Sequence, residues 1–455
     1  MDSEDNSSVN SAQRVSEKEN QEDVIKSPQL ALASECFTFI KRGARYVPAT
    51  RWKLQNNLLV GVGFLELANA GDFAANVFND VPVPPYAVAL MVLGGILALS
   101  LSCFAFQDFR LGCSNMLLLR EERQRLRKSK AVCSVDEHIN KDLDTRLSVN
   151  FREMGTEIIS RILMDTFMGF GAIVIGIGTF MAIGGANRRV WYASNLLSGY
   201  IGNVPLALYA VINASWCFYV RTKAHQHGKA GSEALHGQLA EALLRRRVHT
   251  VEIYATVNGI TSLLGGAGSL IAATKWWGYV ILAVVIISSI SCNYVWRHRV
   301  GYERPVRGDV IGMTKDSLLK ELEFIVSAQK IIQETPSKPL LGLVADSQSI
   351  MAVIEFIVDN DLFEDFCDRL LRDSRVSTSL VAVLDGGLTI NSSHLLAIDK
   401  HYNPYFLEVA QACVGETGRT LFKYRERYLL EMLGSYLCIT KSKSLRTVVD
   451  ARAEA

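Results

Sequence analysis

Four polar residues in an otherwise apolar stretch are the best candidates for chemistry in this chain. They share the second half of the segment 57–78 and, at about 100° per residue, fall within one sector of a helix; they are Glu66, Asn69, Asp72 and Asn76. A carboxylate in apolar surroundings is costly unless it faces water or a polar partner, and it can gain and lose a proton. The spacing predicts a polar face that either lines an ion or substrate path or holds a helical bundle together by hydrogen bonds.

Two further residue types in the apolar segments suggest roles. Asn203 and Pro205 could break a helix beside a binding site, so Asn203 joins the path candidates. Glycine recurs in segments that no strand precedes, which makes a phosphate-binding loop a poor interpretation. Small residues let membrane helices approach closely, so we expect helix packing at Gly171, Gly176, Gly178, Gly265 and Gly266.

Length and composition indicate which elements position these residues. The chain has 455 residues, 49% of them hydrophobic and 21% charged, and a mean hydropathy of +0.16. Its apolar residues gather in charge-poor stretches of about 20, long enough to cross a hydrocarbon core of roughly 30 Å. A collagen, a coiled coil, a small disulfide-stapled domain and a wholly soluble enzyme are excluded. The net charge of +2 argues against nucleic-acid binding.

Six segments are predicted to cross the membrane. They are 57–78, 85–106, 166–186, 198–220, 253–274 and 276–296. The last five contain no charged residue, whereas Glu66 and Asp72 make a partly buried or re-entrant helix the alternative for the first. Short links alternate with long ones, which predicts an all-α membrane protein with six transmembrane helices in three hairpins.

The cations near the segment ends predict the orientation. They gather before the first segment, in the long links 107–160 and 221–250 and after residue 296, whereas the opposite side has Arg188, Arg189 and Lys275. By the positive-inside rule both termini and both long links are cytosolic.

A helical stretch ends close to the bilayer in the second long link. Its last turn carries Arg245, Arg246 and Arg247, which we expect to contact anionic lipid headgroups.

The parts of the chain outside the apolar segments are expected to differ in how well ordered their structure is. Residues 1–28 are polar and acidic, as in a disordered tail, and residues 29–56 form an interfacial, helical lead-in with aromatic residues among cations. Residues 302–446 have the hydropathy of a cytosolic, mostly helical domain, followed by a tail at 447–455. Within that domain, Thr314 is expected to cap a helix that ends before Pro336.

No catalytic or metal-binding signature is present. The nine cysteines are widely spaced, His225 and His227 lack further ligands at metal spacing, and no serine-protease, zinc-protease, Walker or kinase motif occurs. We therefore expect no enzymatic activity, no cofactor and no metal.

Two basic stretches carry a general resemblance. They read REERQRLRKSK at 120–130 and WRHRVGYERP at 296–305 and, with the acidic tail and six segments, the chain resembles uncharacterised polytopic integral membrane proteins of filamentous fungi. The resemblance implies membrane residence only. Three hairpins also suggest the mitochondrial carriers, but their P-x-[DE]-x-x-[KR] motif is missing from every hairpin.

Two functional hypotheses follow. The first is a small-molecule or ion transporter, or a channel-like protein, with a polar path along the first segment. The alternative is a non-transporting membrane scaffold, whose cytosolic links and C-terminal domain recruit protein partners while the polar residues only hold the bundle together; an intramembrane enzyme ranks third.

Overall fold

The computed structural model of this chain is mostly helical. It describes residues 36–42, 45–49, 52–55, 60–78, 83–132, 136–306, 312–372 and 388–453. The expected acidic tail, 1–28, lies outside these residues.

The chain divides into two compact units. The small unit comprises Met1–Arg51 and Val326–Phe422, and the bundle unit comprises Trp52–Ile325 and Lys423–Ala455. The division falls within two helices, α12 (Lys315–Glu334) and α19 (Arg419–Ala453). The units therefore do not coincide with the expected domain at 302–446, and α19 is helical through most of the expected tail at 447–455.

Five helical stretches among the described residues are long and apolar enough to cross a membrane. They are Pro85–Val132, Glu137–Ala182, Arg188–Ala234, Leu239–Ala272 and Gly278–Val300. Each overlaps one of the last five expected spans. Most of the long links between the spans are themselves helical extensions of them rather than loops.

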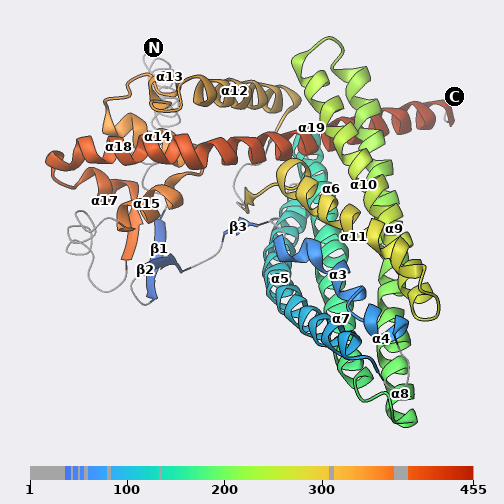
Figure 1. Ribbon diagram of the computed structural model, residues 1–455. Helices are drawn as coiled ribbons and strands as arrows, with labels where there is room; N and C mark the ends of the chain where they lie inside the picture. Colours follow the sequence, from blue (N-terminus) through green and yellow to red (C-terminus); the bar gives the residue numbers. More distant parts are fainter. Residues whose placement is uncertain are drawn as a thin grey trace, which may run out of the picture. The chain divides into compact units, whose positions relative to one another are not determined.

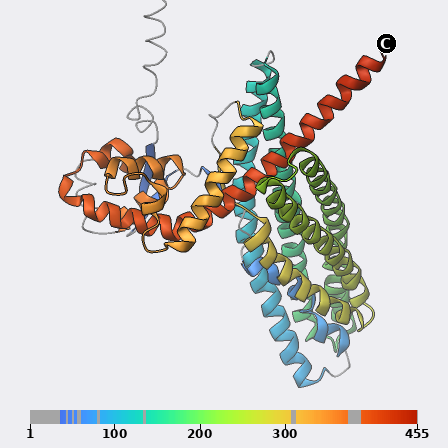
Figure 2. The same ribbon diagram turned by 90° about the horizontal axis from the view of Figure 1, so that it is seen from above.

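Three of these stretches contain a π-helical turn, and the other two are single α-helices. The elements are α5 (Pro85–Val132); α6 (Glu137–Glu157), η2 (Ile158–Leu163) and α7 (Met164–Ala182); α8 (Arg188–Ser194), η3 (Asn195–Ile201) and α9 (Asn203–Ala234); α10 (Leu239–Ala272); and α11 (Gly278–Val295) with η4 (Trp296–Val300). In Figures 1 and 2 the long helices α5, α7, α9, α10 and α11 run side by side.

The first expected span is not one continuous helix. It consists of a 3₁₀ turn, η1 (Val60–Phe64), and two short helices, α3 (Glu66–Asn69) and α4 (Phe73–Val77). Bonds of the 3₁₀ type join these pieces, such as Gly71 N–H to Ala68 O at 3.0 Å. The backbone is therefore largely satisfied within the segment although the α-helix is broken.

This broken segment runs antiparallel to α5. Gly61 lies against Phe104, Gly71 lies against Gly94, and the Phe78 and Tyr86 rings meet at 5.4 Å. The 18 residue steps of α5 from 86 to 104 extend about 27 Å, close to the thickness of a hydrocarbon core. The segment thus accompanies α5 over the length of a membrane span.

The small unit has its own core. A three-stranded antiparallel sheet, β2 (Arg45–Pro48), β1 (Cys36–Arg42) and β5 (Leu388–Asn391), pairs Phe39 with Pro48 and with Leu388. The accompanying helices are α13 (Leu340–Leu343), α14 (Ile350–Asp359), α15 (Phe363–Arg372), α17 (Ser392–Leu396), α18 (Asn403–Cys413) and the short η5 (Lys400–Tyr402) and η6 (Val414–Gly418).

The expected helical lead-in at 29–56 is wrong where the structure describes it. Residues there form β1, β2 and β3 (Lys53–Leu54), which pairs with β4 (Arg304–Pro305). Phe37 and Phe39 lie on one face of β1, with Phe39 buried and Thr38 between them exposed. This is the two-residue period of a strand. The chain is thus not purely α-helical.

The capping residue and the proline expected from the sequence match the start and end of α12. Ser317 N–H donates to Thr314 Oγ1 at 3.2 Å and Thr314 N–H donates to Ser317 Oγ at 2.9 Å. The helix ends at Glu334, before Pro336. This reciprocal capping confirms the expected helix start and end.

Candidate functional site

The structure divides the polar stripe of the first segment into two pairs. Asn69 Nδ2 donates to Glu66 Oε2 at 2.7 Å, within α3. Glu66 Oε1 would lie 3.4 Å from a Cβ at Gly265, so this carboxyl faces α10. The absence of a side chain at Gly265 leaves room for it.

The second pair gains a partner that the sequence did not indicate. Asn76 Nδ2 donates to Asp72 Oδ2 at 2.8 Å, and the Tyr279 hydroxyl of α11 donates to Asp72 Oδ1 at 2.8 Å. Asp72 is 1% exposed. The stripe therefore faces α10 and α11 inside the bundle.

Asn203 has a structural role in the turn that precedes α9. Its Nδ2 donates to the carbonyl oxygens of Ser198 and Gly199, at 3.1 and 3.0 Å, across the π-helical turn η3. The residue thus stabilises the widened turn before α9 and is not brought to the polar stripe by any of these bonds.

The five glycines assigned to packing lie against neighbouring elements. A Cβ added at any of them would come within 2.7–3.2 Å of an atom of another helical segment; they are Gly171, Gly176, Gly178, Gly265 and Gly266. Such distances are shorter than ordinary contacts, so glycine permits the observed approach.

The three arginines assigned to lipid headgroups lie in different environments. Arg245 and Arg246 are exposed, and Arg245 forms an ion pair with Glu241 at 2.8 Å. Arg247 is 7% exposed and pairs with Glu431 at 3.1 Å. Its headgroup assignment is therefore wrong, because the guanidinium points into the bundle.

Sequence reasoning missed two buried ionic clusters. The first, here the acid cluster, consists of Asp108, Glu157, Arg161 and Asp165. Arg161 Nε and Nη2 each donate to an Asp108 oxygen at 2.8 Å, and Nη1 lies 3.4 Å from Glu157 Oε2. Nη1 also donates to Gln55 O at 3.1 Å. A bidentate pair of this kind is a strong, directional contact.

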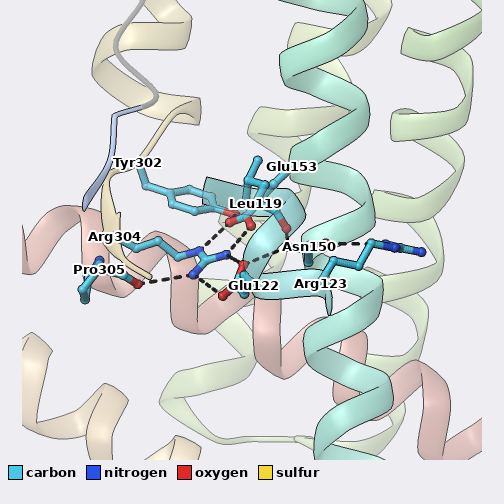
Figure 3. Close-up of polar contacts among 8 residues, drawn as sticks. All are labelled: Leu119, Glu122, Arg123, Asn150, Glu153, Tyr302, Arg304 and Pro305. Atoms are coloured by element: carbon cyan, nitrogen blue, oxygen red, sulfur yellow. Dashed lines mark hydrogen bonds and ion pairs between the residues drawn. The ribbon is translucent and has the colours of Figure 1, made fainter. Parts of the chain in front are cut away.

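The second cluster, here the lock cluster, joins three arginines to three glutamates. Its members are Arg152, Arg247, Arg304, Glu122, Glu153 and Glu431. Figure 3 shows Arg304 between Glu122 and Glu153, at 2.7 and 2.6 Å, with the Tyr302 hydroxyl donating to Glu153. Asn150 Nδ2 donates to Glu122 at 2.8 Å.

Glu431 is the acceptor at the other end of the lock cluster. It pairs with Arg152 of α6 and Arg247 of α10, and His227 Nδ1 of α9 lies 3.8 Å away. Burial disfavours its charge, but Arg152 and Arg247 outweigh that effect and lower the pKa of Glu431 to about 2. For Arg304 burial is likewise outweighed, by Glu153 and Glu122, which raise its pKa well above the usual range.

Two adjoining cavities of about 50 Å³ each lie in the bundle unit. One reaches Glu431 of the lock cluster, and the other reaches Glu157 and Arg161 of the acid cluster and Gly63 of the first segment. They share the lining residues Thr156, Ser160, Tyr254, Asn258 and Trp296. Each is roomy enough for a few water molecules and too small for a large organic solute.

A sequence signal for the acid cluster existed. Asp108 follows the segment 85–106 directly, and Glu157, Arg161 and Asp165 recur every four residues before the segment 166–186. This spacing places their side chains on one helix face. The lock cluster, in contrast, joins residues up to 309 positions apart, from Glu122 to Glu431, which no local pattern indicates.

Comparison of the chain with protein-family models, curated proteins and solved structures finds no match.

Proposed function

We propose that this protein is an integral membrane transport protein that carries a small ion along a path beside its first segment. The observation that supports the proposal best is the broken segment η1–α3–α4, which accompanies α5 for about 27 Å. Broken helices at membrane depth occur where they line a cavity or an ion site, and in transporters they form the binding site.

The chemistry of this segment supports an ion as the cargo. Glu66 and Asp72 are carboxyls that face other helices, and the water-sized cavities continue from Gly63 toward Glu157 and Glu431. Polar groups therefore follow one another along the bundle. Intramembrane carboxyls of this kind mark ion paths and proton relays.

The proposal includes six crossings with both termini in the cytosol. The antiparallel course of the first segment beside α5 supports the sixth crossing. The flanking cations support the orientation, with Arg161 and Arg247 at the cytosolic end of the bundle. The exposed Arg245 and Arg246 remain available there to anionic headgroups.

The scaffold remains the alternative, and its support is the small unit, which has its own sheet and core and could recruit protein partners. It predicts that Glu66 has only a structural role. The proposal excludes enzymatic activity.

The test is ion flux through the full-length protein in liposomes that contain dyes for pH and for potassium. We expect the wild type to accelerate the decay of an imposed proton or potassium gradient, and Glu66→Gln to slow this flux about tenfold or more, equivalent to about 1.4 kcal/mol. Glu121→Gln, an exposed carboxyl on α5, is the matched control and should leave the flux unchanged. Wild-type flux no faster than in protein-free liposomes would refute transport and favour the scaffold.

A further inference from the structure

The acid cluster contains more carboxyls than its cation can neutralise. Three carboxyls, Asp108, Glu157 and Asp165, surround the single guanidinium of Arg161, and all four residues are at most 3% exposed. The Arg161 donors point at Asp108, Glu157 and the Gln55 carbonyl. Excess buried negative charge is costly and is relieved when a carboxyl binds a proton.

Asp165 is the carboxyl of the acid cluster that accepts no hydrogen bond from Arg161. Among the described residues, no hydrogen-bond donor reaches either of its oxygens. It lies one turn beyond Arg161 on the same helix face, and Arg161 donates two bonds to Asp108, so the Asp108 carboxyl from α5 lies beside this face. Two ionised carboxylates repel each other, whereas one acid and one carboxylate can share a hydrogen bond.

The other groups that face Asp165 supply one counter-charge, which Asp108 and Glu157 share. Asp108 comes from α5, Glu157 and Arg161 from the preceding turns of its own helix, and the Tyr209 phenol from α9. Arg161 is the one cation in this set. A proton is therefore the simplest species that reduces the excess negative charge, since the described residues contain no cluster of His, Cys, Asp and Glu suited to a metal.

We propose that Asp165 and Asp108 form a proton-binding pair, in which the Asp165 carboxylic acid donates a hydrogen bond to the Asp108 carboxylate. When the proton leaves, the O–H bond of Asp165 breaks, the electron pair stays on its carboxylate, and a water molecule accepts the proton; the cavity lined by Glu157 and Arg161 of the same cluster has room for such water. This pair identifies the proton as the ion that binds at the cytosolic end of the proposed transport path. Its role in transport rests on the proposed function, but its protonation does not.

Infrared spectroscopy of the full-length protein in liposomes tests the pair directly. A protonated carboxyl has a C=O stretching band separate from that of a carboxylate, and the band shifts in D₂O. We expect the wild type at neutral pH to show a band component that Asp165→Asn removes. The exposed Asp359→Asn in α14 is the matched control and should retain it.

A second variant keeps the test decisive if Asp165→Asn does not fold. Asp108→Asn frees the Arg161 guanidinium for Asp165, which should then ionise, so this variant should lose the same band component. An unchanged acid band in both folded variants would overturn the pair.

The infrared spectrum and the flux measurement can refute the proton-binding pair and the transport function independently of each other. A wild type that shows the Asp165 band but no flux would support the pair and refute transport. A wild type with flux sensitive to Glu66→Gln but without the Asp165 band would keep transport and overturn the pair. If both hold, Asp165→Asn should reduce proton flux about tenfold or more while potassium flux stays at the protein-free level.

Discussion

Arg304 and Arg161 are both buried arginines that bind two carboxylates each, but the charges around them differ. Arg304 belongs to the lock cluster, in which three arginines meet three glutamates. Arg161 is one cation among three carboxyls, and Asp165 accepts no hydrogen bond from the described donors. Equal numbers in one cluster and an excess of acids in the other predict opposite responses to mutation.

The difference separates a structural ionic cluster from one that can exchange a proton. In the lock cluster every charge has a partner, so removing one leaves another buried and uncompensated. In the acid cluster Asp165 is uncharged while it holds its proton, so replacing it leaves no additional buried charge without a partner. The lock cluster also joins α5, α6 and α10 to α19, whereas the acid cluster lies beside the cavity.

The largest effect is expected at Arg304. Arg304→Met leaves Glu122 and Glu153 buried without their cation, and should reduce the free energy of unfolding by about 3–5 kcal/mol. Unfolding of the purified protein in mild detergent, followed by circular dichroism, measures the change.

The matched control for Arg304 is Arg245→Met. Arg245 pairs with Glu241, but its side chain is 73% exposed, so this loss should cost no more than about 1 kcal/mol. Equal effects for the two variants would mean that the lock cluster contributes nothing beyond a surface ion pair.

A pH-dependent effect of intermediate size is expected at Glu431. Its pKa falls from 4.5 to about 2 because Arg152 and Arg247 outweigh burial. A lowered pKa stabilises the folded state above pH 4.5, and the contribution is lost as the pH falls toward 2. Glu431→Gln should therefore be less stable than the wild type at pH 7, by up to about 3 kcal/mol.

Melting curves over a pH series measure this difference between Glu431→Gln and the wild type. The gap should narrow below pH 4.5. A gap that stays constant down to pH 3 would show that the lost contacts of Glu431, rather than its charge, explain the destabilisation.

The smallest effect on stability is expected at Asp165. Asp165→Asn replaces an acid that lacks a counter-charge by an amide that can donate to Asp108, so stability at pH 7 should stay within about 1 kcal/mol of the wild type or rise. The same unfolding measurement, with Glu153→Gln as the lock-cluster counterpart, checks it. A loss at Asp165 as large as that at Glu153 would remove the distinction between the clusters.

Local sequence patterns predicted one part of the candidate site, the polar stripe of the first segment. The three-residue spacing of Glu66 and Asn69 predicted that they share a helix face, and they do share a hydrogen bond. Local patterns did not predict the break in the first segment, because no proline or charge run marks residues 65, 70 and 71. Nor did they predict Tyr279, which lies 207 residues after Asp72.

The sequence by itself determined where five long apolar helices lie and the start and end of α12. These depend on hydropathy over about 20 residues and on capping within one turn, both of which are local. Tertiary structure decided which charges are buried together. Glu431 reaches Arg152 and Arg247 only because α19 packs on α6 and α10, and Asp165 is left over only because Asp108 of α5 occupies Arg161. A side chain's electrostatic environment depends on residues distant in sequence, so spacing alone does not reveal it.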